Sequence, residues 1–281
     1  MRSFKGAQTC GRVLVLGWVL LAAAAAAATP EFFGVDNTNL VRLDLATGTK
    51  TVVGALGVDQ LADIDFNGAG TLLAVRYGLG GGFPPTPLYE GWSINTTTGA
   101  GTFLSTFGFD HLFAGLAYRP ADGKMYTVDQ NTGYLGTVNL YNATFTPLTA
   151  TPHGLGQYKV DALAFAPNGV LYGLHNEVPP IFGYLYDLVQ FDLTTGLGTV
   201  IGSVDGGVGD YQSLRFDPTT GVAYTINTLN GSASTINLAT GAGTVIWNGL
   251  APGVTGLALI PEPATLSLLA LTALLAPRRR R

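Results

Sequence analysis

A chain of 281 residues with 39 glycines, 15 prolines and only 11% charged residues is long enough for one large core, and its composition favours short strands and turns over helices. Residues 31–260 contain 17 acidic and seven basic side chains, a net charge of −10. This acidic balance argues against nucleic acid as a partner.

The first 28 residues begin with three basic side chains, after which residues 13–28 are apolar. This is the order of the basic and hydrophobic regions of a signal peptide. A membrane anchor is the alternative, but about 16 apolar residues are short for the roughly 20 that a spanning helix needs. We therefore predict a cleaved signal peptide at 1–28. Its removal takes away Cys10, the single cysteine, so the mature protein would contain no disulfide.

Residues 32–260 alternate between two sequence patterns, which indicates an internal repeat. The first pattern is an apolar strand, an Asp or Asn, a turn and a second strand. Four of its five copies have a glycine four residues after the polar residue, which supplies the positive φ of a tight hairpin. In the third copy, we expect Asn142, just before Ala143, to be the left-handed residue. The five polar residues are Asp44, Asn95, Asn139, Asp192 and Asn237.

The second pattern is an alternating strand, a turn of Pro, Asn, Asp or Gly, and another strand, which is typical of a hairpin. Its copies lie at 62–75, 114–128, 161–174 and 213–226. Together, one copy of each pattern supplies four antiparallel strands every 44 to 53 residues, as in a β-propeller blade.

The two ends of the body complete a fifth blade. Residues 32–53 lack a first strand and residues 254–260 lack a partner, so pairing them closes the ring and removes exposed sheet edges. We therefore predict an all-β, five-bladed β-propeller over residues 29–260. An immunoglobulin-like pair of sandwiches is the alternative, but it gives no reason for a single repeat. The body resembles β-propeller repeat proteins, its D-x-x-T-G hairpin being similar to that of PQQ-like and YVTN-like secreted propellers. This resemblance fixes no activity.

Motifs for catalysis are scarce in the predicted mature chain. It has no G-x-S-x-G elbow, no H-E-x-x-H, no phosphate loop and no cysteine nucleophile. The densest acidic cluster is Asp59, Asp63 and Asp65, where other repeats carry mostly small residues. Calcium or a polar ligand in the channel is one interpretation of this cluster. Pairing with Arg215, or solvation by channel water, is the other.

The connections between the repeated hairpins vary in length and content, and variable loops on a rigid scaffold are where recognition usually occurs. Their aromatic and polar side chains suit stacking on sugar rings, so we expect a glycan or protein ligand there. The alternative is that these aromatics only plug the mouth of the channel. The candidate residues are Phe83, Tyr89, His111, Tyr158, Lys159, Asp161, Tyr184 and Tyr211.

The C-terminal 21 residues run from Pro261, Glu262 and Pro263 through an apolar stretch to four arginines at 278–281. A helix packed on the body would not explain arginines beside a stretch without a polar face. The segment resembles the PEP-CTERM sorting signal. That resemblance implies transient membrane insertion, recognition by an exosortase, removal of the tail and delivery to the envelope or extracellular matrix of a Gram-negative bacterium.

These features predict three parts: a signal peptide at 1–28, a propeller at 29–260 and a sorting tail at 261–281. The expected function is a non-enzymatic binding or structural module at the cell surface or in the matrix, with exosortase and extracellular polysaccharide or a surface protein as partners. No cofactor is expected, and calcium is the alternative. The alternatives are an extracellular lactonase-like or lyase-like propeller with a metal in its channel, and an adhesive protein without a discrete pocket.

Overall fold

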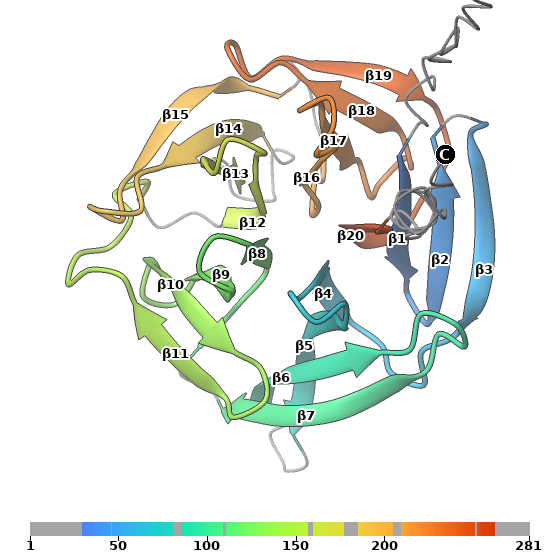
Figure 1. The fold of residues 1–281 in the computed structure, drawn as a ribbon, viewed down its shortest axis with the longest axis horizontal. Coiled ribbons are helices and arrows are strands. Elements are labelled where there is room, and N and C mark those ends of the chain that lie inside the picture. Colours follow the sequence, from blue (N-terminus) through green and yellow to red (C-terminus); the bar gives the residue numbers. More distant parts are fainter. Residues whose placement is uncertain are drawn as a thin grey trace, which may run out of the picture.

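In the part of the chain that the computed structural model describes, twenty strands form five four-stranded antiparallel sheets around a central axis (Figure 1). The predicted five-bladed propeller is confirmed. The described residues are 30–45, 47–80, 86–108, 111–156, 160–176, 185–204, 209–250 and 252–261. The predicted signal peptide and all of the sorting tail except Pro261 lie outside these ranges. Within them, no helix is long and apolar enough to cross a membrane.

Each blade is named here from its innermost strand outward. Blade I contains β20 (Val254–Leu259), β1 (Glu31–Asp36), β2 (Asn39–Asp44) and β3 (Thr49–Ala55), and blade II contains β4 (Leu61–Phe66), β5 (Leu72–Gly80), β6 (Thr86–Ile94) and β7 (Gly101–Gly108). Blade III contains β8 (Ala117–Arg119), β9 (Lys124–Asp129), β10 (Tyr134–Asn139) and β11 (Thr144–Pro147). Blade IV contains β12 (Val160–Phe165), β13 (Leu171–Asn176), β14 (Tyr186–Phe191) and β15 (Gly198–Ser203), and blade V contains β16 (Arg215–Phe216), β17 (Ala223–Ile226), β18 (Ala233–Ile236) and β19 (Gly243–Trp247).

The two ends of the body meet in blade I, as the sequence predicts. β20 is the innermost strand and pairs antiparallel with β1, with Phe32 opposite Leu259. The Ile260 N–H then donates to the Glu31 carbonyl at 2.9 Å. On the outside of the ring, Trp247 of blade V donates its Nε1–H to the Leu45 carbonyl of blade I at 2.7 Å. The ring is therefore closed by contacts at its innermost strand and at its outer hairpins.

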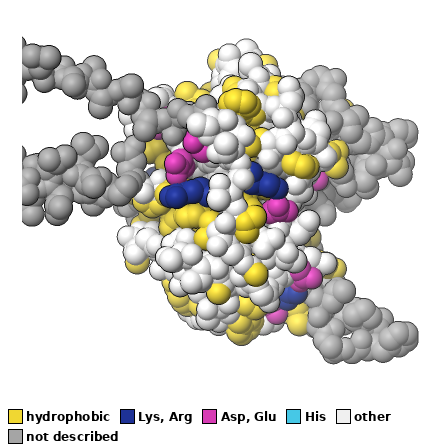
Figure 2. Space-filling model, turned by 90° about the vertical axis from the view of Figure 1, so that its right-hand side faces the viewer, with side chains coloured by type: hydrophobic (Ala, Val, Ile, Leu, Met, Phe, Trp, Pro, Cys, Tyr) yellow, Lys and Arg dark blue, Asp and Glu magenta, His cyan; other side chains and the backbone are white. Residues whose placement is uncertain are grey.

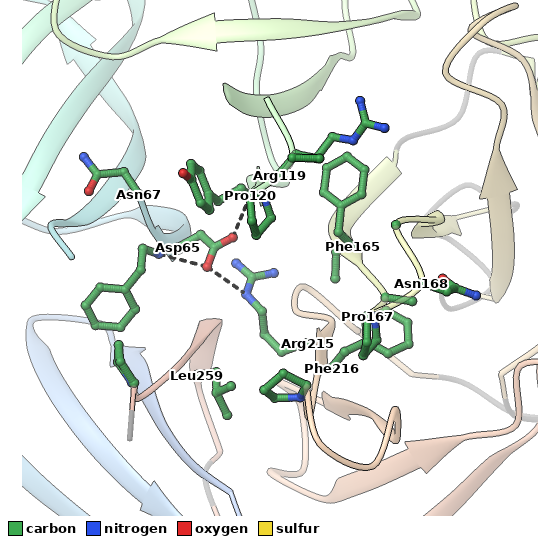
Figure 3. A pocket seen from close by; sticks show the side chains of 18 residues that line it. Asp65, Asn67, Arg119, Pro120, Phe165, Pro167, Asn168, Arg215, Phe216 and Leu259 are labelled. Carbon is green, nitrogen blue, oxygen red and sulfur yellow. Dashed lines mark hydrogen bonds and ion pairs between the residues drawn. The ribbon is translucent and has the colours of Figure 1, made fainter. Parts of the chain in front are cut away.

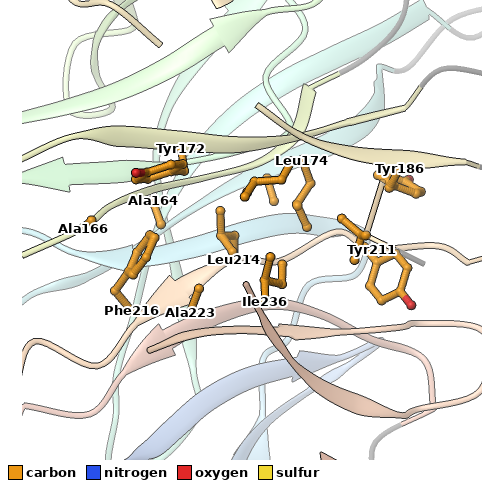
Figure 4. Close-up of a cluster of buried hydrophobic side chains, with 13 residues drawn as sticks. Ala164, Ala166, Tyr172, Leu174, Tyr186, Tyr211, Leu214, Phe216, Ala223 and Ile236 are labelled. Carbon is orange, nitrogen blue, oxygen red and sulfur yellow. The ribbon is translucent and has the colours of Figure 1, made fainter. Parts of the chain in front are cut away.

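Five clusters of buried hydrophobic side chains in the described residues hold neighbouring blades together. Each cluster draws its members from two adjacent blades. Between blades IV and V, for example, Tyr172 and Tyr186 pack with Leu214, Phe216 and Ile236 (Figure 4). Because side chains alternate between the two faces of a strand, each blade can contribute to the cluster on either side of it. The core is thus a ring of interfaces rather than one central mass.

The outer hairpin of each blade uses the same turn chemistry. In all five blades, the polar residue of the first pattern accepts a hydrogen bond from a backbone N–H two or three residues later; these residues are Asp44, Asn95, Asn139, Asp192 and Asn237. In four blades the left-handed residue is the predicted glycine.

Blade III corrects one prediction. The left-handed residue there is Ala143, with φ 52°, and not Asn142. The turn register places the positive φ four residues after the polar residue in every blade, whatever side chain stands there. Asn142 instead accepts a hydrogen bond from the Thr144 hydroxyl at 2.7 Å. An alanine in this conformation costs about 1–2 kcal/mol, which the surrounding hairpin offsets.

The surface carries few charged side chains. Seen from the side of the ring, they occur in small groups that mix both signs and are separated by uncharged surface (Figure 2). On blade I, for example, Arg42 pairs with Glu31 at 3.0 Å and Lys50 pairs with Asp36 at 2.7 Å. This view shows no extended basic patch.

Candidate functional site: the two mouths of the central channel

The innermost strands β4, β8, β12, β16 and β20 surround the central axis (Figure 1). In an up-and-down antiparallel blade, the turns after the first and third strands lie on one face of the ring. The turn after the second strand and the connection to the next blade lie on the other. We call these the turn face and the loop face. Each face has a cavity at its mouth of the channel.

A buried ion cluster lies between the two mouths. Arg215 of β16 directs its guanidinium at blade II, where Nη2 lies 3.2 and 3.3 Å from the two carboxylate oxygens of Asp63 and also donates to the Ile64 carbonyl. Nη1 donates to the Leu163 carbonyl of blade IV at 2.8 Å. Asp65 lies farther away, with Oδ1 3.7 Å from Arg215 Nε. We call Asp63, Asp65 and Arg215 the central charge cluster.

The cluster also ties blade II to blade III. Asp63 accepts from the Leu116 N–H and Asp65 from the Tyr118 N–H, both at 2.8 Å. Burial raises the pKa of Asp63 to about 7, while Arg215 and the backbone amides act in the opposite direction. Burial likewise raises the pKa of Asp65. Because every hydrogen bond that Asp63 makes is accepted, its surroundings suit the carboxylate form.

Asp59, the third predicted metal ligand, is separate from this cluster. Its carboxylate is 58% exposed and lies 2.7 Å from Arg76 Nη2, a hydrogen bond that lowers the pKa of Asp59. In the described ranges, no three His, Cys, Asp or Glu side chains form a group that could hold a metal ion. The pairing of Asp63 and Asp65 with Arg215, which the sequence offered as an alternative, is present. Calcium at Asp59, Asp63 and Asp65 stays a prediction.

The loop-face cavity has a volume of about 440 Å³ and combines tyrosines with amides and a carboxylate. Its described lining includes Tyr77, Tyr89, Gln130, Asp161 and Gln212. Two of these, Tyr89 and Asp161, are residues that the sequence predicted. The Tyr77 and Tyr89 rings lie 5.5 Å apart, and Tyr77 is 37% exposed. An aromatic surface thus faces polar side chains across one mouth of the channel.

Hydrogen bonds hold the polar side of this cavity in place. The Tyr186 hydroxyl lies 2.8 Å from Asp161 Oδ2 and 3.1 Å from Asp210 Oδ1, so one phenol hydrogen is shared between two carboxylates. Gln130 Nε2 donates to Asp161 at 3.2 Å, and Gln212 Nε2 donates to both Asp210 oxygens at 3.1 Å. Burial and the two carboxylates raise the pKa of Tyr186 far above its ordinary value, so it remains a neutral donor. The carboxylates are therefore oriented before any ligand arrives.

The remaining predicted residues of the loop face divide into two groups. His111 Nδ1 lies 2.9 Å from Asp129, and its ring stacks on Phe113 at 5.5 Å. Tyr211 is only 3% exposed, packs edge-on against Tyr186 and belongs to the buried cluster between blades IV and V. The others lie outside the described residues: Phe83, Tyr158, Lys159 and Tyr184, together with Glu262 and Pro263 of the sorting motif.

Sequence reasoning missed Tyr77, Gln130, Gln212 and Tyr186 as members of this site. A signal for Gln212 was present, because the position just before the small inner-strand residue is Ala62, Ala114, Asp161, Gln212 and Thr255 in the five repeats. At this aligned position only Asp161 of blade IV and Gln212 of blade V are strongly polar, which points to the channel mouth at these two blades. Gln130 and Tyr186 have no such signal. Gln130 directly follows β9 and Tyr186 begins β14, so each adjoins a connection whose length differs from blade to blade.

No protein-family model matches this chain, and neither does any curated protein sequence. Solved structures do resemble it. One is a chain of a nidogen–laminin complex, with 11% identity, a TM-score of 0.53, and coverage of 83% of this chain and 98% of the other. Another is a putative 6-phosphogluconolactonase from Bacteroides uniformis, with 10% identity, a TM-score of 0.50, and coverage of 83% and 100%. Similarity at this level of identity shows the propeller fold alone.

Proposed function

We propose that this protein is an exported, exosortase-sorted bacterial surface or matrix protein whose propeller binds a neutral glycan at the loop-face cavity. The observation that carries the binding proposal is the arrangement of Asp161, Tyr186 and Asp210, oriented by two glutamines, opposite the Tyr77 and Tyr89 rings. Oriented carboxylates and amides hydrogen-bond sugar hydroxyls, while an aromatic ring covers the apolar face of a sugar.

The charge of the cavity favours a neutral glycan over an acidic one. Asp161 lines the cavity and Asp210 is linked to it through Tyr186. A uronic acid would bring a third carboxylate to this mouth at an electrostatic cost.

Export and sorting are supported by where the strands lie relative to the two predicted cleavage regions. β1 begins at Glu31, after the predicted signal peptide, and β20 ends at Leu259, before Pro261. The last ladder bond, from Ile260 to Glu31, also precedes the Pro-Glu-Pro motif. Removal of both terminal segments would therefore cost the propeller no strand.

Replacing Tyr77 by alanine should weaken binding of neutral oligosaccharides at least tenfold, because stacking on an exposed ring is lost while the blade cores stay intact. Binding is measured by calorimetry after screening an array of neutral bacterial oligosaccharides, with alginate oligosaccharides as the acidic comparison. Tyr141→Ala is the matched control, since Tyr141 is 53% exposed on a blade III hairpin of the turn face and should leave binding unchanged. Equal binding by Tyr77→Ala and the unsubstituted protein, or a preference for alginate, would rule out this site.

A further inference from the structure

The cavity on the turn face is the larger of the two, with a volume of about 720 Å³, and it lies away from the proposed glycan site. It is enclosed by the inner turns of blades II to V, and Asp65 and Arg215 lie at its bottom (Figure 3). Phe66, Phe165 and Phe216 contribute aromatic rings to its lining. Its volume falls within the range of about 300–1,000 Å³ that is typical of small-molecule sites.

At the bottom of this cavity, Asp65 is the carboxylate that lies farther from Arg215. The central charge cluster contains two carboxylates and one guanidinium, and Arg215 makes its shorter contacts with Asp63, which is completely buried. Asp65 keeps 18% of its side chain exposed and meets Arg215 only at 3.7 Å. Each Asp65 oxygen accepts one backbone N–H at 2.8 Å, which leaves room for a further donor from the cavity.

The repeat shows that the second carboxylate is not a requirement of the fold. At the position of Asp65, three other blades carry alanine, namely Ala117, Ala164 and Ala258. Neutralising Arg215 needs one carboxylate, and Asp63 already supplies it. Asp65 ties β4 to β8 through the Tyr118 N–H, but the blades with alanine at this position do without such a carboxylate, and Asp65 is the most exposed member of the cluster.

The rest of the lining suits an organic cation. Aromatic rings attract cations through their faces, and the cavity already contains one such contact, with the Arg119 guanidinium 5.8 Å from the centre of the Phe165 ring. Arg119 itself is balanced by Asp122 at 3.1 Å. Prolines supply much of the remaining wall, at positions 120, 167 and 218. An apolar body would thus be desolvated against the wall while a positive group reaches Asp65.

We propose that the turn-face cavity binds a primary amine with an aromatic or aliphatic body, whose ammonium group pairs with Asp65. The site is at the opposite end of the channel from the loop-face cavity, and its ligand is of a different chemical class. Binding of an amine here does not depend on whether the loop face binds a glycan.

The test uses three probes of one shape that differ in charge: 2-phenylethylammonium, 2-phenylethanol and phenylacetate. Calorimetry on the purified protein should show the ammonium probe binding at least tenfold more tightly than the alcohol, with phenylacetate weakest. Asp65→Asn should reduce the ammonium affinity to that of the alcohol. Asp192→Asn removes a carboxylate from an exposed outer turn of blade IV and should change nothing.

A second substitution keeps the proposal testable if Asp65→Asn fails to fold. Asn168 lies on an exposed inner turn at the rim, where its Oδ1 accepts the Val170 N–H at 3.1 Å, so Asn168→Asp keeps that bond and adds a negative charge. It should strengthen ammonium binding several-fold, and Asn168→Lys should weaken it. Equal binding of the ammonium and alcohol probes, tighter binding of phenylacetate, no binding of any probe, or full affinity in a folded Asp65→Asn variant would overturn the proposal.

Discussion

Replacing Arg215 by methionine should lower the free energy of unfolding by about 3–5 kcal/mol, the cost of leaving buried carboxylates without their counter-charge. Asp63 is completely buried, and Arg215 is the one cation among its hydrogen-bond partners in the described structure. Denaturation in urea, followed by circular dichroism, measures the change. Arg42→Met is the control, since Arg42 and Glu31 form an exposed pair worth at most about 1 kcal/mol.

The triple variant Asp63→Ala, Asp65→Ala, Arg215→Met tests whether Arg215 stabilises the protein by neutralising the buried carboxylates, because it removes the carboxylates together with the arginine. Replacing a whole buried ion cluster by apolar side chains is often neutral, because the cost of desolvating the charges disappears with them. Alanine also occurs at the Asp65 position in three other blades. We expect the triple variant to recover part of the stability that the single variant loses, since the Leu116 and Tyr118 N–H groups lose their carboxylate acceptors. A triple variant as unstable as Arg215→Met, or a single variant as stable as the unsubstituted protein, would refute the role given to the cluster.

Deleting residues 254–261 should abolish cooperative folding. The deletion removes β20 and with it Val254, Leu257 and Ala258, which belong to the clusters on both sides of blade I. Each buried Val or Leu side chain contributes about 1.5–3 kcal/mol, and the lost ladder exposes β1 as an edge strand. These losses are comparable to the total stability of about 5–15 kcal/mol that domains have. Size-exclusion chromatography should show aggregates, and thermal melts should show no sharp transition.

A circular permutant separates loss of closure from loss of residues. Ile260 and Glu31 already share a backbone hydrogen bond, so a turn copied from residues 67–71 joins them, and the chain is reopened within the inner turn at 120–123. This protein keeps every strand and closes blade III across its new ends. We expect it to fold as a monomer with a cooperative melt. A monomeric, cooperatively melting deletion variant would contradict the closure account.

The fold could be predicted from the sequence because its signals are local and repeated. Alternating apolar residues and turn residues such as the glycines after Asp44 and Asn95 define each hairpin, and the incomplete hairpins at the two ends define the closure. The one turn that was predicted wrongly, at Asn142, shows that the register of a hairpin outweighs the intrinsic preference of a residue for the left-handed region.

The sites were harder to predict because their members come from different blades. Asp63 and Arg215 are 152 positions apart. The repeat alignment places both on inner strands at neighbouring positions, but it does not show whether the carboxylates pair with Arg215 or bind a ligand. The loop-face cavity depends on Gln130 and Tyr186, whose places are set by connections that follow no repeat. The sequence therefore indicated the loop face as a whole, but only two of the described residues that line its cavity, Tyr89 and Asp161.

The most direct test of the proposal that this propeller is the working part of an exported protein is the intact mass of the protein recovered from its native host. The account predicts a chain that starts near Thr29 and lacks the arginine cluster at 278–281, with all twenty strands retained. Recovery of the full 281-residue chain, with both terminal segments uncleaved, would contradict it.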